Sequence, residues 1–524
     1  MNARTTMLSR RSLLAAAGVT AGAAALGANT ALAADAPAFD ETYDVVVIGY
    51  GLAGAMTSLS AVEAGATKVL LVDAAPQGEE GGNSRFAAQA VLNTRDPEMM
   101  FEHQMAVAEG FDVDEDVLRA YCEGMEVSNL TKNLATLGVT EPVFWDEYFA
   151  STPEDQQESG MKMLCDINTP EYPEYVGGEA VNIATIHEGI SDAALYLAAQ
   201  EAVEANEAIT VWLESPATKL VQDPETKTIT GVVVEHEGAE TTIGASNGVV
   251  LCCGGFECNP EMIQTYLGFP NLVPKGGLYN KGDGIRMAQE VGADLWHMSN
   301  YEIFGIFGGY VPKTEVGKRY PMTCLYASAG SIIGVDEDGL RFAREGEWWS
   351  RHGHVRRDGG WHMANTSFAP FMVFDEAQKA ALEEGGQISD EAWADTISAS
   401  SVEELAEKMG VSAENLAGTI ERYNGYAEAG FDPEQQRDPA TMKPLDLSGT
   451  IYANPLSPSV LNTQGGPRRN AKSQVVDVNG EPIPHLYSAG ECGGITTHLY
   501  EGGGNLSECI AFGRIAGTNV VELA

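Results

Sequence analysis

A short β-branched segment followed by a glycine turn is the feature that most constrains how this chain can fold. Residues 43–49 read YDVVVIG, which is typical of a buried parallel strand. The segment leads into Gly49, Gly51 and Gly54, which have the GxGxxG spacing, then into a helical stretch and a second strand that ends at Asp73. Such glycines permit a tight turn, close approach of a diphosphate to the backbone, and close packing of helix on strand. The sequence therefore predicts a βαβ unit that binds a dinucleotide, with Asp73 accepting hydrogen bonds from a ribose diol.

Several glycine-rich segments favour FAD over NAD as the dinucleotide. They read GGNS at 81–84, GVVLCCGGF at 248–256, KGDG at 281–284 and LYSAGE at 486–491. A further glycine-rich helix start at 503–506 can donate backbone N–H groups to the pyrimidine ring of a flavin, where negative charge collects on reduction. We therefore expect FAD as the cofactor.

The order of the expected elements divides the chain into two domains. A stretch rich in glycine, tryptophan and tyrosine separates the early strands from two amphipathic helices, which are expected at 401–410 and 413–428. We predict an α/β protein with a Rossmann-like FAD-binding domain formed by residues 40–304 and 461–524. An inserted α+β capping (lid) domain at 305–460 is expected to cover the substrate.

The N-terminal segment has the pattern of an export signal. Residues 9–14 read SRRSLL and precede an apolar run, rich in alanine and glycine, that ends in Ala31-Leu32-Ala33. We interpret residues 1–33 as a twin-arginine (Tat) signal peptide, with a retained anchor helix as the alternative. No later segment has eighteen consecutive apolar residues. Because a protein exported in the folded state can receive its cofactor in the cytoplasm, we expect a periplasmic, cell-surface or extracellular location.

The charge and the cysteine pattern exclude several classes of function. The formal net charge is −44, from 31 basic and 75 acidic residues. Nucleic acid is therefore not an expected partner, because a phosphate-binding surface needs a dominant basic face. The eight cysteines include neither a CxxC pair nor a CxxCH haem motif. Cys252, Cys253 and Cys258 suggest a metal cluster, but adjacent cysteines in a strand point to opposite faces, so we expect no metal site.

Taken together, the motifs resemble those of a known flavoprotein family. GxGxxG, GGNS, GDG, GLRFARE, GGPRRN, LYSAGE and GGGN…FGRIAG are similar to motifs of soluble fumarate reductases, urocanate reductases and 3-ketosteroid Δ1-dehydrogenases. The resemblance covers nearly all of the chain after the signal. It implies an FAD-dependent enzyme that holds substrate between the flavin and the capping domain. The FAD contacts that it implies are Gly49, Gly51, Ala53, Gly54, Asp73, Gly82, Asn83, Ser84, Ala217, Asp283, Gly490, Glu491, Asn505 and Leu506. Glu491 would hold a ribose or ribityl hydroxyl.

The residues with which soluble fumarate reductases bind a dicarboxylate are different in this chain. The resemblance leads us to expect a Thr-Glu pair, a relay arginine, a proton-donating arginine, a histidine and a terminal arginine. In that order, the chain has Thr323-Cys324, Ala327, Trp349, Leu461 or Asn462, and Tyr500. Since buried carboxylates without partners are costly, we do not expect fumarate to be the substrate.

Two residues near the C-terminus are candidates for binding a substrate oxygen. Tyr500 and Gly504 resemble the ketosteroid dehydrogenase pattern, in which a tyrosine hydroxyl and a backbone N–H donate hydrogen bonds to a ketone. A phenol is a fair donor to a developing enolate oxygen. A tyrosine that only packs beside the flavin is the alternative.

The basic segment EWWSRHGHVRR, at 347–357, supplies further candidates in a chain that is otherwise acidic. Arg351 can donate a proton or hold an anionic group, and a salt-bridged surface loop is the alternative. Trp349 suits an aromatic substrate or the core of the capping domain. Tyr326 is a further candidate proton donor.

These features predict an exported FAD-dependent oxidoreductase that reduces an activated C=C bond of an enoate or enone in anaerobic respiration. A ring-ketone desaturase of the 3-ketosteroid Δ1-dehydrogenase type is one alternative, and a flavoprotein that only relays electrons is another. The chain has no second dinucleotide motif for NAD(P)H and no haem motif. The expected electron donor is therefore an extracytoplasmic quinol-linked cytochrome or flavoprotein, and the expected substrate is a small unsaturated molecule.

Overall fold

The computed structural model describes most of the chain after the predicted signal. The described residues are 38–190, 192–303, 310–312, 329–345, 350–357, 359–385, 388 and 390–524. Those from Phe39 onward belong to one unit. The predicted signal peptide and five residues singled out above lie outside the described residues; the five are Thr323, Cys324, Tyr326, Ala327 and Trp349.

The predicted βαβ unit forms the centre of a mostly parallel sheet. In sheet order the strands are β22 (Gln474–Val476), β23 (Pro482–Ser488), β9 (Ala239–Leu251), β1 (Glu41–Ile48), β2 (Val69–Val72) and β6 (Ile209–Trp212). β1 pairs in parallel with both β2 and β9, and β23 also runs parallel to β9. An antiparallel extension on β9 consists of β8 (Ile229–His236) and β7 (Ala217–Gln222). This topology confirms the Rossmann-like prediction.

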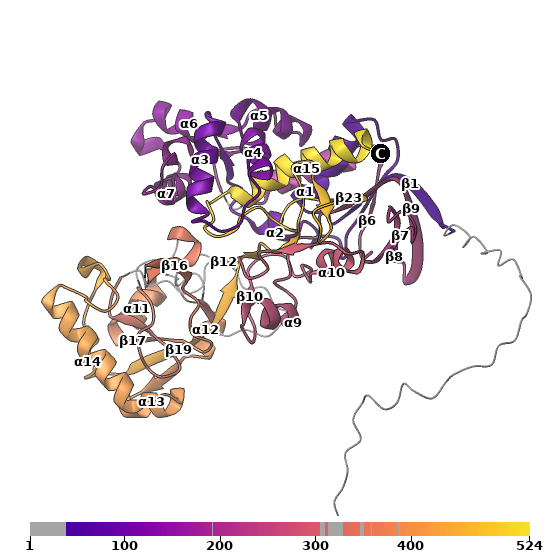
Figure 1. Cartoon of the computed structure of the whole chain (residues 1–524). Helices are drawn as coiled ribbons and strands as arrows, with labels where there is room; N and C mark the ends of the chain where they lie inside the picture. The colour runs from indigo at the N-terminus through magenta and orange to yellow at the C-terminus, as the bar shows by residue number, and fades with distance from the viewer. Residues whose placement is uncertain are drawn as a thin grey trace, which may run out of the picture. The chain divides into compact units, whose positions relative to one another are not determined.

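Alternate residues of β1 build the two faces of the sheet. Val45 and Val47 pack in a cluster with helices α1 (Leu52–Glu63) and α15 (Gly504–Glu522), which lie side by side in Figure 1. Val46 and Ile48 point to the other face, where they join residues of β8 and of α10 (Asp283–Glu290). Because both faces are covered, the strand reads as a continuous apolar run.

The segment between β2 and β6 adds helices and a small sheet to this domain. The helices are α2 (Gly82–Phe86), α3 (Pro97–Val107), α4 (Glu115–Gly124), α5 (Val127–Thr136), α6 (Trp145–Ser151), α7 (Ser159–Asn168) and α8 (Ala194–Glu204). The sheet consists of β3 (Val91–Asn93), β5 (Asn182–Thr185) and β4 (Val143–Phe144). Asp96 and Asp114 cap α3 and α4, because their carboxylates accept backbone N–H groups of the first turn.

A second sheet carries the predicted capping domain. Its strands are β10 (Val273–Pro274), β19 (Ile451–Val460), β17 (Phe371–Asp375) and β14 (Ile332–Val335), with β13 (Tyr310–Pro312) and β18 (Ile397–Ala399) paired to β19. The associated helices are α11 (Glu376–Glu384), α12 (Asp390–Ala394), α13 (Val402–Met409) and α14 (Ala413–Ala429). The hydroxyls of Ser401 and Ser412 cap α13 and α14, so the two helices begin within one residue of the expected positions.

One strand departs from the expected boundary between the domains. β10 lies inside the segment 40–304, yet it pairs in parallel with β19 of the capping sheet. α10 follows it in the chain and packs in the core of the first domain. The helix α9 (Pro260–Met262) precedes it. A pair of residues is too short to show an alternating pattern, so the sequence carries no signal for this strand.

Short antiparallel pairs join the two halves of the first domain where the capping segment leaves and returns. β11 (Leu295–Trp296) pairs with β21 (Gly466–Pro467), and β12 (Tyr301–Glu302) pairs with β20 (Asn462–Thr463). A hairpin of β15 (His354–Arg357) and β16 (Gly360–Met363) follows the turn at residues 350–353. Among the described residues, no helix combines the length and apolar character that a membrane crossing needs.

Candidate functional site

The main cavity brings together residues from both ends of the chain. It encloses about 1670 Å³ of empty space, part of which opens to solvent. Thirteen of the fourteen expected FAD contacts line it, namely Gly49, Gly51, Ala53, Asp73, Gly82, Asn83, Ser84, Ala217, Asp283, Gly490, Glu491, Asn505 and Leu506. Gly54 lies outside the lining because it packs against the glycine turn, where an added Cβ would stand 1.9 Å from the carbonyl oxygen of Gly49.

The glycine turn leaves room for a ligand only because it has no side chains. Gly49 has a φ of +107°, and a Cβ there would lie 2.2 Å from the carbonyl oxygen of Cys252. Gly51 caps α1 without a side-chain hydrogen bond. The backbone N–H of Leu52 donates to the hydroxyl of Ser84 at 3.2 Å, which ties α2 to the start of α1. The N-terminus of α1 therefore faces the cavity, as expected for a diphosphate site.

Asp73, at the end of β2, is held by backbone N–H groups of the glycine turn and of the residues that follow it. Its two carboxylate oxygens accept the backbone N–H groups of Tyr50 at 2.6 Å and of Ala75 at 2.7 Å. Burial raises the pKa of Asp73. Each carboxylate oxygen has a further lone pair, so the residue can also accept a ribose hydroxyl.

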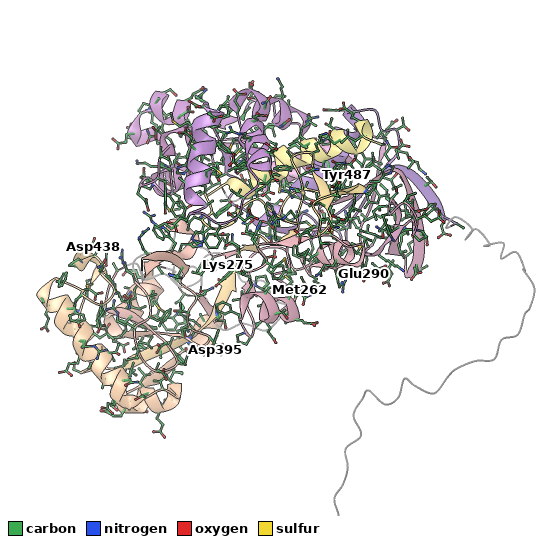
Figure 2. All side chains as sticks on the ribbon, viewed as in Figure 1. Met262, Lys275, Glu290, Asp395, Asp438 and Tyr487 are labelled. Carbon is green, nitrogen blue, oxygen red and sulfur yellow. The ribbon has the colours of Figure 1, made fainter. Side chains whose placement is uncertain are left out.

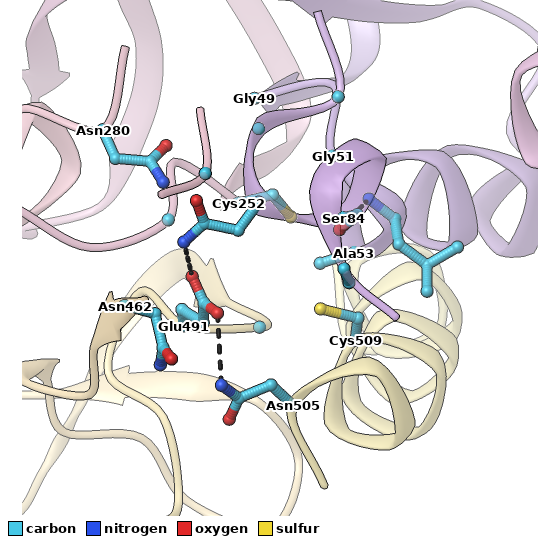
Figure 3. Close-up of a pocket in the computed structure, with 18 of the residues that line it drawn as sticks. Gly49, Gly51, Ala53, Ser84, Cys252, Asn280, Asn462, Glu491, Asn505 and Cys509 are labelled. Atoms are coloured by element: carbon cyan, nitrogen blue, oxygen red, sulfur yellow. Dashed lines mark hydrogen bonds between the residues drawn. The ribbon is translucent and has the colours of Figure 1, made fainter. Parts of the chain in front are cut away.

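Buried carboxyl and amide groups form a network at the centre of the cavity (Figure 3). Glu491 accepts hydrogen bonds from the side-chain amides of Asn83 at 2.9 Å and Asn505 at 3.2 Å. Asn83 also donates to Glu257 at 2.7 Å, and Asn280 donates to Glu257 at 2.6 Å. Burial, with the nearby Glu257 carboxylate, raises the pKa of Glu491 to about 8. The network therefore presents a polar, largely uncharged surface to the hydroxyls of a ribityl chain.

Glu257 and Asn280 are site residues that the sequence analysis did not identify. Asn280 lines the cavity, and Glu257 is only 2% exposed behind it. Glu257 follows the glycine pair at the carboxyl end of β9, which is where parallel α/β sheets bind their ligands. That position is the signal that could have identified it.

Tyr500 and His352 lie side by side on one wall of the cavity, here called the Tyr500 wall, and Asn462 also lines the cavity. The hydroxyl oxygen of Tyr500 accepts the backbone N–H of Asn505 at 3.2 Å. The ring of His352 stands edge-on to the ring of Tyr500, with 4.6 Å between the ring centroids. Burial, together with the carboxylates of Glu302 and Glu171, raises the pKa of Tyr500. Tyr500 therefore remains a neutral hydrogen-bond donor.

The expectation that the N–H of Gly504 binds a substrate oxygen is wrong. This N–H donates to the carbonyl oxygen of Glu501 at 2.9 Å, and Gly504 does not line the cavity. The left-handed conformation of Gly503, with a φ of +88°, folds the chain back so that this bond closes a turn. Among the described residues, the N–H of Leu506 has no acceptor within the chain, so it is the donor that this helix start offers to a ligand.

Arg351 does not line the cavity either. Its guanidinium donates to both carboxylate oxygens of Glu174, at 2.6 and 3.2 Å, and it stacks over the ring of Trp361 at 4.6 Å. This arrangement corresponds to the alternative of a salt-bridged loop. The neighbouring His352 points into the cavity instead, and Tyr326 and Trp349 lie outside the described residues.

His352 of the Tyr500 wall belongs to one of two buried carboxyl–imidazole pairs in this region. Nδ1 of His352 is 2.9 Å from both carboxylate oxygens of Glu171. Nε2 of His103 is 2.6 Å from a carboxylate oxygen of Glu501. The sequence indicated His352 only as part of the basic segment. Glu171 carries no local motif, because it reaches its partner across 181 positions of the chain.

The cavity fits the expected cofactor. The glycine turn can accept a diphosphate, Asp73 a ribose diol, and the amide–carboxyl network a ribityl chain. Among the described residues, no group of three or more histidine, cysteine, aspartate or glutamate side chains could hold a metal ion.

Comparisons with known proteins agree with this arrangement. The model of a family described as "FAD binding domain" matches residues 44–506. A probable fumarate reductase of Shewanella frigidimarina is 28% identical over 492 residues, which cover 92% of this chain and 76% of that protein. A 3-oxosteroid 1-dehydrogenase of Mycobacterium tuberculosis is 31% identical over 336 residues, or 57% of this chain and 58% of the relative. The open form of a flavocytochrome c3 fumarate reductase superposes with a TM-score of 0.66 at 26% identity, over 92% of this chain and 79% of that one.

Proposed function

Because this chain belongs to the FAD binding domain family and is an FAD-dependent oxidoreductase acting on carbon–carbon bonds, we propose that it reduces the activated C=C bond of an enoate or enone. We further propose export by the Tat route, on the basis of the SRRSLL segment. Its electrons would then come from an extracytoplasmic quinol-linked cytochrome or flavoprotein, and the organic acceptor would serve anaerobic respiration.

One observation carries the proposal: the Tyr500 wall and the glycine turn line the same cavity. FAD, when bound and reduced, supplies the hydride for such a reaction. A substrate held against Tyr500 therefore lies in the same enclosed space as the cofactor, which fixes its orientation and limits the access of water.

Tyr500 is proposed to hold the carbonyl oxygen of the substrate. Its own oxygen already accepts the N–H of Asn505, so its hydroxyl hydrogen is directed to another acceptor. A neutral phenol stabilises negative charge that develops on an enolate oxygen. The bond from Asn505 also fixes where the phenol oxygen lies.

The lining of the cavity argues against a dicarboxylate substrate. No arginine is among its described lining residues. Arg351, the described arginine nearest in sequence to His352, is paired with Glu174. A second carboxylate on the substrate would therefore lose hydration without a guanidinium to pair with it, which supports a neutral or singly charged acceptor.

The test is reoxidation of the photoreduced holoenzyme by unsaturated compounds under anaerobic conditions. The panel comprises acrylate, fumarate, urocanate, cinnamate and 4-androstene-3,17-dione. The proposal expects at least one compound other than fumarate to reoxidise the protein faster than buffer and faster than fumarate. Bleaching of the oxidised protein by a saturated ring ketone, with no reoxidation by enones, would favour the desaturase instead. No response to any compound would favour an electron relay.

Tyr500→Phe tests the role of the tyrosine. We expect the rate of reoxidation to fall by roughly 10²–10³-fold, because a single oxyanion donor typically contributes that much. Tyr487→Phe is the matched control. That tyrosine, labelled in Figure 2, is buried in β23 and donates to the carbonyl of Asn519 at 3.3 Å, away from the cavity. A loss below about tenfold in Tyr500→Phe would remove the tyrosine from the mechanism.

A further inference from the structure

The turn that carries His352 is held in a strained conformation. Arg351 and His352 have φ values of +58° and +42°, which are unfavourable for residues with a side chain. The carbonyl of Arg351 accepts the hydroxyl of Tyr172 at 3.1 Å, and Nδ1 of His354 lies 3.1 Å from the same oxygen. Such strain persists where the surroundings over-determine the backbone, often at functional sites. Here it directs the imidazole of His352 into the cavity beside Tyr500.

The carboxylate of Glu171 fixes the orientation of that imidazole. Both of its oxygens are 2.9 Å from Nδ1 of His352, and one of them also accepts the backbone N–H of Gly502 at 3.1 Å. Glu171 is 3% exposed, so solvent does not compete for these bonds. A carboxylate bound to one ring nitrogen sets the tautomer, and the other nitrogen, Nε2, then exchanges protons with a reacting group.

A second pair holds the backbone of Glu171. The N–H of Glu171 donates to Oε2 of Glu501 at 3.2 Å, and Oε1 of Glu501 is 2.6 Å from Nε2 of His103. Glu501 directly follows Tyr500 in the chain. The same segment thus places the tyrosine on the cavity wall and supports the carboxylate behind His352.

We propose that His352 is the acid that protonates the α carbon of the substrate, and that Glu171 is its positioning residue. The inference rests on the proposed function. As the β carbon receives a hydride, with its two electrons, the C=C π bond breaks and its electron pair moves onto the α carbon and the oxygen held by Tyr500. The N–H bond at Nε2 of the imidazolium then breaks and a C–H bond forms at the α carbon, which leaves a neutral imidazole. His352 regains its proton from water, so one hydride and one proton saturate the double bond.

The neighbours of His352 suit this role. Among the described residues, the groups that face it include the Glu171 carboxyl group, the Tyr500 ring and the imidazole of His354. Burial lowers the pKa of His354 to about 3, so that ring stays neutral, and Tyr500 stays protonated. Glu171 therefore supplies a buried acidic group in direct contact with Nδ1 of His352.

His352→Gln and Glu171→Gln in the holoenzyme test the proposal, with the panel compound that reoxidises wild type fastest. We expect His352→Gln to lower the single-turnover rate by roughly 10²–10⁴-fold while FAD content is kept, since general acids contribute that much. In wild type the rate should be slower in D₂O than in H₂O, because a proton transfers to carbon in the measured step. In His352→Gln this solvent isotope effect should disappear. Glu171→Gln should lower the rate at least tenfold. The exposed His362→Gln on β16 is the control.

Chemical rescue by imidazole distinguishes a proton-donating role of His352 from a purely structural one. In His352→Ala, added imidazole should restore the rate in proportion to the imidazolium concentration, because the vacated space opens onto the cavity. Such rescue would keep the proposal testable even if His352→Gln is unstable. Wild-type rates in His352→Gln with intact FAD, or an absence of rescue in a folded His352→Ala, would overturn the proposal while leaving the proposed function in place. If no panel compound reoxidises wild type, the proposed function fails and this inference fails with it.

Discussion

Glu302 is a buried acidic residue near Tyr500 whose carboxyl group makes no hydrogen bond within the described residues. It is fully buried in β12, and neither carboxylate oxygen has a hydrogen-bond partner. Asn462 is paired opposite it in β20, and its side-chain Nδ2 also lacks a partner. Residues paired directly across two strands share one face of the sheet. Unsatisfied groups of this kind cost stability and are retained where function uses them.

Glu302→Gln should therefore reduce the pH dependence of stability. Burial raises the pKa of Glu302 well above its usual value of 4.5, so the folded state keeps a proton that the unfolded state loses. The contribution of Glu302 is then complete below about pH 4.5 and is lost progressively as pH rises. Between pH 5 and pH 8, the free energy of unfolding measured in urea should fall more for wild type than for the variant. The difference is about 1.4 kcal/mol for each unit of raised pKa over that range.

Glu384→Gln is the control for that measurement, because Glu384 is exposed at the end of α11. It should leave the pH dependence of wild type unchanged. An identical dependence in Glu302→Gln and wild type would mean that Glu302 has a partner in solution.

Arg351 is expected to matter much less than its neighbour His352. Its ion pair with Glu174 is partly exposed, at 26% and 41% of the two side chains. Such pairs contribute about 0–1 kcal/mol. Arg351→Gln and Glu174→Gln should each slow reoxidation less than about tenfold. A 100-fold loss in Arg351→Gln alone would return that residue to the role of proton donor.

The strand–turn–helix at the start of the first domain can be tested as a unit. Gly49→Ala would place a Cβ 2.2 Å from the carbonyl oxygen of Cys252 at a φ of +107°. Because β1 and β9 are both buried, the backbone cannot relax easily. We expect purified Gly49→Ala to lose most of its FAD, as measured by the ratio of flavin to protein absorbance.

Gly65→Ala is the matched control for the turn. Its φ is +114°, yet a Cβ there has no heavy atom within 4 Å. The free energy of unfolding of that variant should fall by only roughly 1–2 kcal/mol, which is what a left-handed backbone conformation costs a residue with a side chain. The variant should keep its FAD. Equal FAD loss in both variants would show that strain, and not the close approach to Cys252, limits binding.

The whole chain carries a formal net charge of −44, which should steer its electron donors. Such a field attracts cationic donors and repels anionic ones, and salt screens it over about 8 Å at physiological ionic strength. Raising the ionic strength from about 0.01 to 0.15 M should slow reduction of the holoenzyme by methyl viologen radical cation severalfold. Reduction by dithionite, an anion, should become faster. The same response to salt for both donors would contradict electrostatic steering.

Much of the fold could be predicted because its signals are local. The apolar run of β1, the glycines after it and the capping serines of α13 and α14 each act on adjacent residues. The family resemblance also indicated thirteen residues of the cavity lining, because the family motifs fall on the turns at strand ends. β10 could not be predicted, since two residues carry no periodicity.

The sequence by itself determined the dinucleotide fold and the glycine turn, because each of these depends on which residue occupies one position in a motif. Only the tertiary structure decided which groups act together. His352 meets Glu171 across 181 positions, and Glu302 lies opposite Asn462 across an entire inserted domain. The N–H of Gly504 is taken by Glu501 because of a turn that the motif does not specify. Hydrogen-bond partners depend on the meeting of distant backbone segments, and a linear pattern does not encode that directly.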